Sequence, residues 1–378
     1  MFHHDEREYQ VAKSEAARRG REKLQGVIDK GRASAQAVIE AVQSRVITDR
    51  VVRAPAVELN YDDEGDRTLR VGGFSSELHE HAYRQVLDNA GVTYKYVEHL
   101  TKEAGGALWG KKLAAQNVNE ILSHRQTQRN LVRGEGETGL VKGFLSDRFR
   151  RLDSRPVADA FIGACQVLGM VPIEGVASDT KMRIRAVLPY VFEPLDGEVM
   201  IFGAELGNSD YGDGGLVVNL WTMRIWCTNL AVAEKCLRQV HLGGRLPDNV
   251  RFSDETYRKD AETTALAVRD VTADAVGPDR VHRMLATIEA AGEDEVKGRD
   301  GIDKILGRLL DKNELSTVKT IYESPDVVNL PAGETVWRLS NAVSWFAQGK
   351  SVTPDRKLAL QELAGTMVAG ETKKVKEV

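Results

Sequence analysis

The sequence predicts an α+β protein, with a mixed or antiparallel sheet core flanked by helices, a long N-terminal helical arm and a helical C-terminal region. Residues 6–46 combine strong helix formers with apolar residues at helical spacing. Residues 181–188 alternate apolar and basic side chains, as strands do, and residues 198–206 and 216–227 are expected to form the next strands. Residues 253–368 return to a helical pattern. We therefore divide the chain into a helical arm (1–54), an α+β core (55–292) and a helical C-terminal region (293–378).

The N-terminal arm has a thin apolar stripe and three glycines, Gly20, Gly26 and Gly31. Each glycine costs a helix about 1 kcal/mol relative to alanine. A helix of this kind needs a packing partner to be stable. That partner could be the core of the same chain or a neighbouring subunit.

The sequence of the first half of the core predicts short helices and strands. Residues 56–74 form a hairpin with DDEGD as its turn, and a helix over 78–90 follows, capped by Ser75 or Ser76. Short helices are expected near 92–100 and 113–123. Two strands flank GEGETG within residues 131–149, and a helix covers 153–168.

The clearest strands are residues 181–188, 198–206 and 216–227. The turn NSDYGDGG separates the second and third of these strands. Helices are expected at 253–275, 279–291, 302–310, 315–322, 335–348 and 355–368, with a break at Gly277-Pro278 between the first two.

The composition is that of a soluble globular protein, with 378 residues, 42% hydrophobic residues and a net charge of -4. The cysteines, Cys165, Cys227 and Cys236, form no CxxC pair, which favours a reducing compartment. No apolar run approaches the length of a membrane span, and the first residues are too polar for a signal peptide. We expect a cytoplasmic protein without membrane contact.

Familiar catalytic motifs are absent from the sequence, which has no GxSxG, Walker loop or HExxH. His79 and His81 are two residues apart and do not converge on one metal ion on a helix. Asp210 and Asp213 resemble a calcium loop in composition but lack the DxDxDG spacing, and a hairpin turn explains them equally well. We expect no metal and no nucleotide cofactor.

Positive charge is concentrated in one part of the chain. Residues 111–185 hold 13 Lys or Arg against 8 Asp or Glu. Arg183 and Arg185 share one strand face, and Arg224 and Trp226 share a face of a later strand. On one water-facing sheet, such groups would bind the phosphates and stack on the bases of single-stranded nucleic acid. The alternative is a core tryptophan with arginines at the sheet rim.

A basic rim is expected beside this sheet, in the stretch RGEGETGLVKGFLSDRFRRLDSR (133–155). Asp147 and Asp153 could orient two of its arginines through bidentate pairs. The predicted nucleic-acid contacts are Arg133, Lys142, Arg148, Arg150, Arg151, Arg155, Lys181, Arg183, Arg185, Arg224 and Trp226.

Several segments resemble the phage/plasmid-like protein family of unknown function. They are Leu131-Val132-Arg133, LSDRFRRLDSR (145–155), NSDYGDGGLVVNLWTMRIWCTNL (208–230) and TVWRLSNAVSWF (335–346). Phe149 stands where the family usually has tyrosine, and Leu230 where it usually has glycine. The family carries no established activity, but its members occur in phages, prophages and plasmids, near replication or recombination genes. A looser fold analogy leads to single-strand annealing proteins.

The expected function is therefore non-catalytic binding of single-stranded DNA in phage or plasmid recombination or replication, by a protein that forms homo-oligomers. One alternative is a phage structural or assembly protein in which the arm mediates subunit packing. A second is an enzyme acting on nucleic acid, with polar candidates Asp147, Arg148, Asp153, Asn208 and Cys227.

Overall fold

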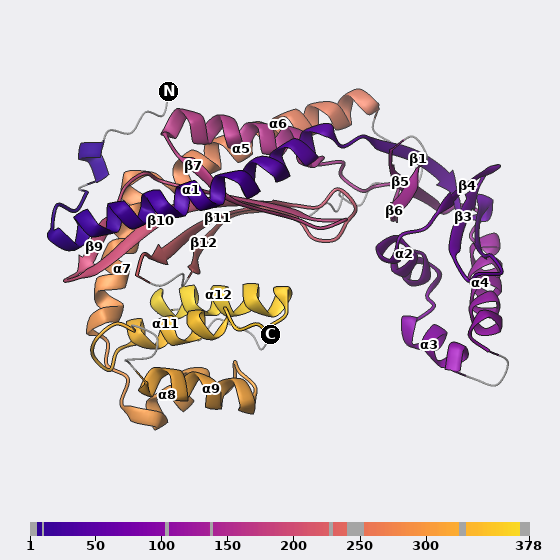
Figure 1. Ribbon diagram of the computed structural model, residues 1–378. Coiled ribbons are helices and arrows are strands. Elements are labelled where there is room, and N and C mark those ends of the chain that lie inside the picture. The colour runs from indigo at the N-terminus through magenta and orange to yellow at the C-terminus, as the bar shows by residue number, and fades with distance from the viewer. Residues whose placement is uncertain are drawn as a thin grey trace.

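The computed structural model describes residues 6–9, 11–102, 106–136, 139–226, 230–239, 253–324 and 330–370. It confirms the predicted fold class, because antiparallel sheets are flanked by helices, with one long helix near the N-terminus and several near the C-terminus. Figure 1 shows two lobes. The large lobe contains residues 6–44 and 154–370, and the small lobe contains residues 47–146. Among the described residues, no helix has the length and apolar character needed to cross a membrane.

The large lobe is built on an antiparallel sheet in the order β12-β11-β10-β8-β7, with β9 paired to β10. Successive side chains of its central strands point to opposite faces, so that odd-numbered residues of β10 face one side and even-numbered residues the other. The strands are β7 (Val171–Ala177), β8 (Met182–Val187), β9 (Phe192–Leu195), β10 (Glu198–Asn208), β11 (Leu216–Arg224) and β12 (Leu230–Gln239).

Helix α1 (Glu15–Ser44) covers one face of this sheet and lies along β7 (Figure 1). Ser14 caps the helix by accepting a hydrogen bond from the Ala17 amide at 2.9 Å. The thin apolar stripe therefore packs on the core of its own chain, with Leu24 and Ile28 in one cluster with Ile201 and Trp221. The predicted arm is an integral layer of the large lobe.

The opposite face of the sheet is covered by helices from later in the chain. Phe202 and Leu206 of β10 share a hydrophobic cluster with Phe161 of α5 and Ile288 of α7. The helices of this layer and of the C-terminal region are α5 (Ser154–Leu168), α6 (Asp254–Ala275), α7 (Pro278–Glu293), α8 (Gly298–Leu306), α9 (Lys312–Glu323), α11 (Val336–Phe346) and α12 (Pro354–Val368).

The small lobe has its own core, formed by residues between Val52 and Phe144. Its two sheets have the orders β1-β5-β6 and β2-β3-β4. Its elements are β1 (Ile47–Arg53), η2 (Ala54–Ala56), β2 (Val57–Tyr61), β3 (Arg67–Val71), β4 (Phe74–Glu77), α2 (Glu80–Ala90), α3 (Tyr94–Lys102), α4 (Ala107–His124), β5 (Arg129–Glu135) and β6 (Leu140–Ser146).

Two local predictions were wrong in this lobe. Residues 47–53 form a strand, although they fell within the predicted helical arm. Ser75 and Ser76 lie in β4, and the cap of α2 is His79, whose ring accepts from the His81 amide at 3.2 Å. Residues 47–53 pair with β5, and residues 74–77 pair with β3. This strand pairing outweighs the local helix signals on which the two predictions were based.

Candidate nucleic-acid interface

The predicted cationic, water-facing surface of the sheet is not formed. The register places Glu205 of β10 opposite Arg185, and Met200 of β10 opposite Arg224. Positions 200 and 205 differ by an odd number, so their side chains point to opposite faces. Arg183 and Arg185 therefore lie on the face that α1 covers, and Arg224 lies on the other face.

Arg185 and Arg224 are also buried, with exposed fractions of 6% and 3%. The Arg185 guanidinium donates to Glu205 at 2.6 Å, and Arg224 pairs with Glu198. Arg183 is half-buried, with its Nε 3.5 Å from the Glu205 carboxylate. Buried charges need such partners, so these arginines are internal members of the sheet.

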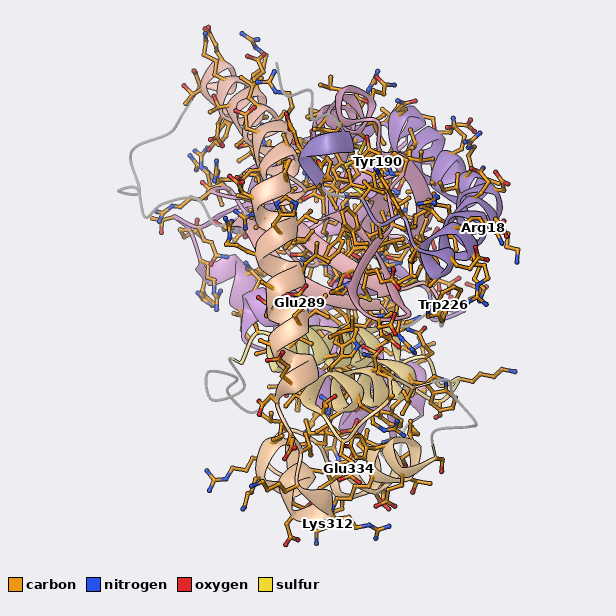
Figure 2. All side chains as sticks on the ribbon, turned by 90° about the vertical axis from the view of Figure 1, so that its left-hand side faces the viewer. Arg18, Tyr190, Trp226, Glu289, Lys312 and Glu334 are labelled. Carbon is orange, nitrogen blue, oxygen red and sulfur yellow. The ribbon has the colours of Figure 1, made fainter. Side chains whose placement is uncertain are left out.

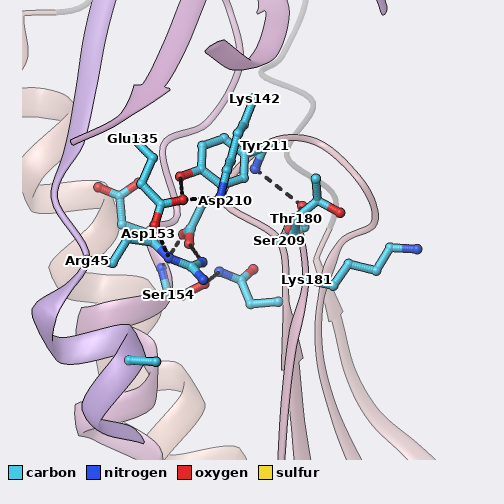
Figure 3. A network of polar contacts seen from close by, with 12 residues as sticks. Arg45, Glu135, Lys142, Asp153, Ser154, Thr180, Lys181, Ser209, Asp210 and Tyr211 are labelled. Carbon is cyan, nitrogen blue, oxygen red and sulfur yellow. Dashed lines mark hydrogen bonds and ion pairs between the residues drawn. The ribbon is translucent and has the colours of Figure 1, made fainter. Parts of the chain in front are cut away.

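A second set of predicted residues meets between the two lobes, in a group of charged side chains. Figure 3 shows part of this group, with Arg45, Glu135, Lys142, Asp153 and Asp210 labelled. We call the whole group the junction network. Arg133 of β5 is 1% exposed and donates to Asp49 and Asp153, both at 2.7 Å. Its remaining nitrogen donates to the Asp210 carbonyl at 2.7 Å. The members of the junction network are Arg45, Asp49, Arg133, Glu135, Lys142, Arg151, Asp153 and Asp210.

The hairpin turn between β10 and β11 contributes the large-lobe side of this network. Asp210 accepts from the Ser154 amide at 2.6 Å, at the start of α5, and pairs with Arg45 at 3.0 Å. Asp213 accepts from Thr180 at 2.6 Å. Gly212 and Gly214 have positive φ angles, as a tight turn requires. The aspartates that resembled a calcium loop are thus engaged in holding a turn and a helix.

The junction network balances its own charge, since its four cations face four carboxylates. Burial by itself lowers the pKa of the Arg133 guanidinium, but Asp153 and Asp49 outweigh it and hold the pKa above its ordinary value. Burial raises the pKa of the Asp153 carboxyl, and Arg133 opposes that shift. The network joins the lobes and leaves no excess charge for a ligand.

The predicted basic rim is partly neutralised as well. Arg150 forms a bidentate pair with Asp260 of α6, and Arg151 lies 3.2 Å from Asp49. Lys142 is buried against Glu135, whereas Lys181 is exposed and pairs with Asp213 at 2.9 Å. Arg148 is half-buried, and Arg155 is exposed without an ion pair to any described residue.

Unpaired positive charge lies instead on the outer side of α1. Arg19, Lys23 and Lys30 are exposed, and four and seven residues separate them, so they follow one side of the helix. We call these three residues the basic stripe. None of them forms an ion pair with a described carboxylate, unlike neighbouring Arg18, which pairs with Glu15 and Glu22 at 2.7 Å.

Trp226 lies beside the basic stripe. The Arg19 guanidinium and the Lys23 ammonium lie 5.7 and 4.9 Å from the centre of its ring. Its indole N–H donates to the Gly197 carbonyl at 2.7 Å, which holds the half-buried ring in place. Figure 2 shows Arg18 of α1 and Trp226 on the same side of the molecule. The structure therefore brings the predicted indole next to cations, but to those of α1 and not to those of the sheet.

The basic stripe is not among the sites predicted from the sequence. Cations at positions 19, 23 and 30, set apart from the apolar residues on a helical projection, are the signal that could have identified it. Among the polar residues of the enzyme alternative, Asp153 lies in the junction network. Asn208 donates to the Leu152 carbonyl at 2.8 Å beside it. Cys227 lies outside the described residues.

Comparisons with protein-family models, with curated proteins and with solved structures found no match for this chain. The resemblance to the phage/plasmid-like family accordingly stays a prediction from motifs. Three of its segments, 131–133, 145–155 and 208–213, meet at the junction network.

Proposed function

We propose that this chain is a non-catalytic nucleic-acid-binding protein that holds the backbone of a single strand along the basic stripe of α1. One observation carries this proposal: the basic stripe is exposed and forms no ion pair with a described carboxylate, while most cations predicted from the sequence are paired with carboxylates within the fold. Unpaired cations on one side of a helix attract a polyanion through counterion release.

Trp226 supports a preference for single strands. An unstacked base can lie against an aromatic ring, whereas bases within a duplex are stacked on one another. The three cations lie within 12 residues of helix, with about 16 Å along its axis from the first to the last, enough to follow several phosphates. A role in recombination or replication of a phage or plasmid rests on the motif resemblance alone.

The test is the affinity of the whole chain for a fluorescently labelled single-stranded 30-mer at several salt concentrations. Replacing the basic stripe in Arg19→Ala/Lys23→Ala/Lys30→Ala removes three phosphate contacts. The slope of log affinity against log salt should then fall by about 2, because each contact to a single strand contributes about 0.7.

The matched control is Arg258→Ala/Lys259→Ala/Arg269→Ala. It removes three exposed cations of α6, each of which lies near carboxylates. The control should bind the 30-mer as the unmodified chain does. Equal affinities and slopes for both triple variants would refute the proposed site. Tighter binding to a duplex of the same sequence would refute the preference for single strands.

A further inference from the structure

Among the described residues, most edge strands make several close backbone contacts with another element besides the strand they pair with, and β1 does not. The edge of β2 is closed by Asn119 of α4, whose side-chain amide bonds to both the N–H and the C=O of Leu59, at 2.8 and 2.9 Å. Helices α1, α7 and α12 pack against β7, β9 and β12. The edges of β4 and β6 contact each other next to the bridge between Leu78 and Val141. Along β1, no comparable cover lies in the described part of the chain.

The open edge of β1 presents a regular row of backbone groups. The Val46 carbonyl and the Ala54 amide both bond toward β5. Backbone groups alternate in direction along an antiparallel strand, so those of Ile47, Asp49, Val51 and Arg53 point away from β5. No other described residue bonds to them. Unpaired backbone groups in this arrangement are a template for another strand.

The side chains in the middle of β1 are exposed, so a second strand could contact them. Asp49, Arg50 and Val51 are exposed in succession, and Val51 is 44% exposed although it is apolar. The strand has no proline, lysine or bulge, which are among the devices that block an open edge, and its charged residues Asp49, Arg50 and Arg53 are of both signs.

We propose that β1 pairs with β1 of a second copy of this chain, antiparallel across a twofold axis, to join two three-stranded sheets. The sequence of the strand selects the register. A centre at Asp49 or Arg50 would place like charges opposite each other. A centre at Val51 places valine against valine and Arg53 of the second copy opposite Asp49, which also pairs with Arg133 and Arg151 of its own chain. The edge is thus complementary to itself, which favours a second copy over another partner. This inference does not depend on nucleic-acid binding.

The first test is the mass of the whole chain in solution by light scattering and sedimentation over a range of concentrations. We expect a dimer. Val51→Lys places two like charges opposite each other and should weaken dimerisation by about tenfold or more. Val46→Lys is the matched control, because Val46 is 58% exposed but lies just outside β1. It should dimerise as the unmodified chain does.

The second test is Val51→Cys, a small change that keeps the fold testable if Val51→Lys does not fold. In the proposed register the two Cα atoms would be about 5.5 Å apart, within the range in which disulfides form. Mild oxidation should give a covalent dimer beyond the background of the unmodified chain, and Val46→Cys should not. A chain that is monomeric at all concentrations, a dimer insensitive to Val51→Lys, or no cross-link through residue 51 would overturn the proposal.

Discussion

Some arginine side chains in this protein are buried in ion pairs and others are exposed to solvent, and the residue type alone does not separate the two groups. Arginine is rarely fully buried unless it is paired. Arg133 meets that condition, because Asp49 and Asp153 lie on either side of its guanidinium. Arg155, in the same stretch of sequence, is exposed. Charge along the chain predicted solvent contact for both, and only the tertiary partners separate them.

Arg133→Ala should therefore lower the free energy of unfolding by about 3 kcal/mol, because it leaves carboxylates in the junction network without their partner. Urea denaturation measures this change. Arg155→Ala, the control from the same stretch, should stay within about 0.5 kcal/mol of the unmodified protein. A loss of similar size in both variants would contradict the structural role assigned to Arg133.

Glu80 predicts a pH dependence of stability. Burial by itself raises the pKa of this carboxyl, but hydrogen bonds from Arg67 and Arg84 outweigh burial and hold the pKa below its ordinary value. The ion pairs therefore stabilise the fold above the unfolded-state pKa, and this contribution is lost as pH falls through the folded-state pKa.

Glu80→Gln should be less stable than the unmodified chain near neutral pH, by less than about 1 kcal/mol because the carboxylate is part-exposed. The difference should shrink as the medium is acidified into the range where carboxyls protonate. Urea titrations at a series of pH values measure it. The control is Glu77→Gln, which changes an exposed carboxylate without an ion pair to a described residue and should stay within about 0.5 kcal/mol of the unmodified chain near neutral pH.

At the scale of elements, α1 and β7 approach closely because each has a glycine at the contact. A Cβ at Gly31 would lie 1.7 Å from the Ile173 carbonyl oxygen, and one at Gly175 would lie 2.5 Å from the Ser34 carbonyl oxygen. Gly26, by contrast, has no atom within 4 Å of the corresponding position. The sequence predicted only that the three glycines weaken the helix. The packing shows that Gly31 permits the close contact with β7, whereas Gly26 lies at a position where a methyl group would meet no atom.

Gly26→Ala should stabilise the protein by about 0.5–1 kcal/mol, because alanine is the better helix former and meets no obstacle. Gly31→Ala should destabilise it by about 1–3 kcal/mol, because the added methyl group forces the helix away from β7. Thermal unfolding of the two variants compares them directly. A shift of the same sign in both would show that this close contact does not exist.

Strands and helices whose apolar residues recur with a regular period were predictable from the sequence. The order and register in which strands pair were not. The alternation in residues 182–187 showed which side chains share a face within that strand. It could not show that Arg224 lies across the sheet from Arg185, because that depends on register. Strand β1 was missed because its apolar positions are few and its main support is β5, far along the chain.

At the scale of the whole molecule, the junction network joins two lobes that have separate cores. The chain crosses between the lobes twice, after α1 and again between β6 and α5. Arg148, Arg150 and Arg151 lie in the second crossing, next to Asp153. Trypsin, which cleaves after arginine, can therefore report whether the lobes separate.

Asp153→Ala removes one ion pair between the lobes and should increase the rate of tryptic cleavage in residues 148–151 by about tenfold, if the pair contributes about 1.4 kcal/mol to closure. Asp159→Ala is the control, because it changes an exposed residue of α5, the helix that begins directly after Asp153. This variant should be cleaved at the rate of the unmodified chain. Equal rates in both variants would mean that this ion pair does not hold the crossing in place.

The position of α1 in the chain order affects how the protein is made. This helix leaves the ribosome well before β7, the strand that it covers, which begins more than 120 residues after the helix ends, at Val171. The small lobe, whose core comes entirely from residues 52–144, is complete before then and can fold as a unit. During synthesis the apolar side of α1 must therefore remain uncovered while a finished lobe forms behind it, a window in which a chaperone would find its binding surface.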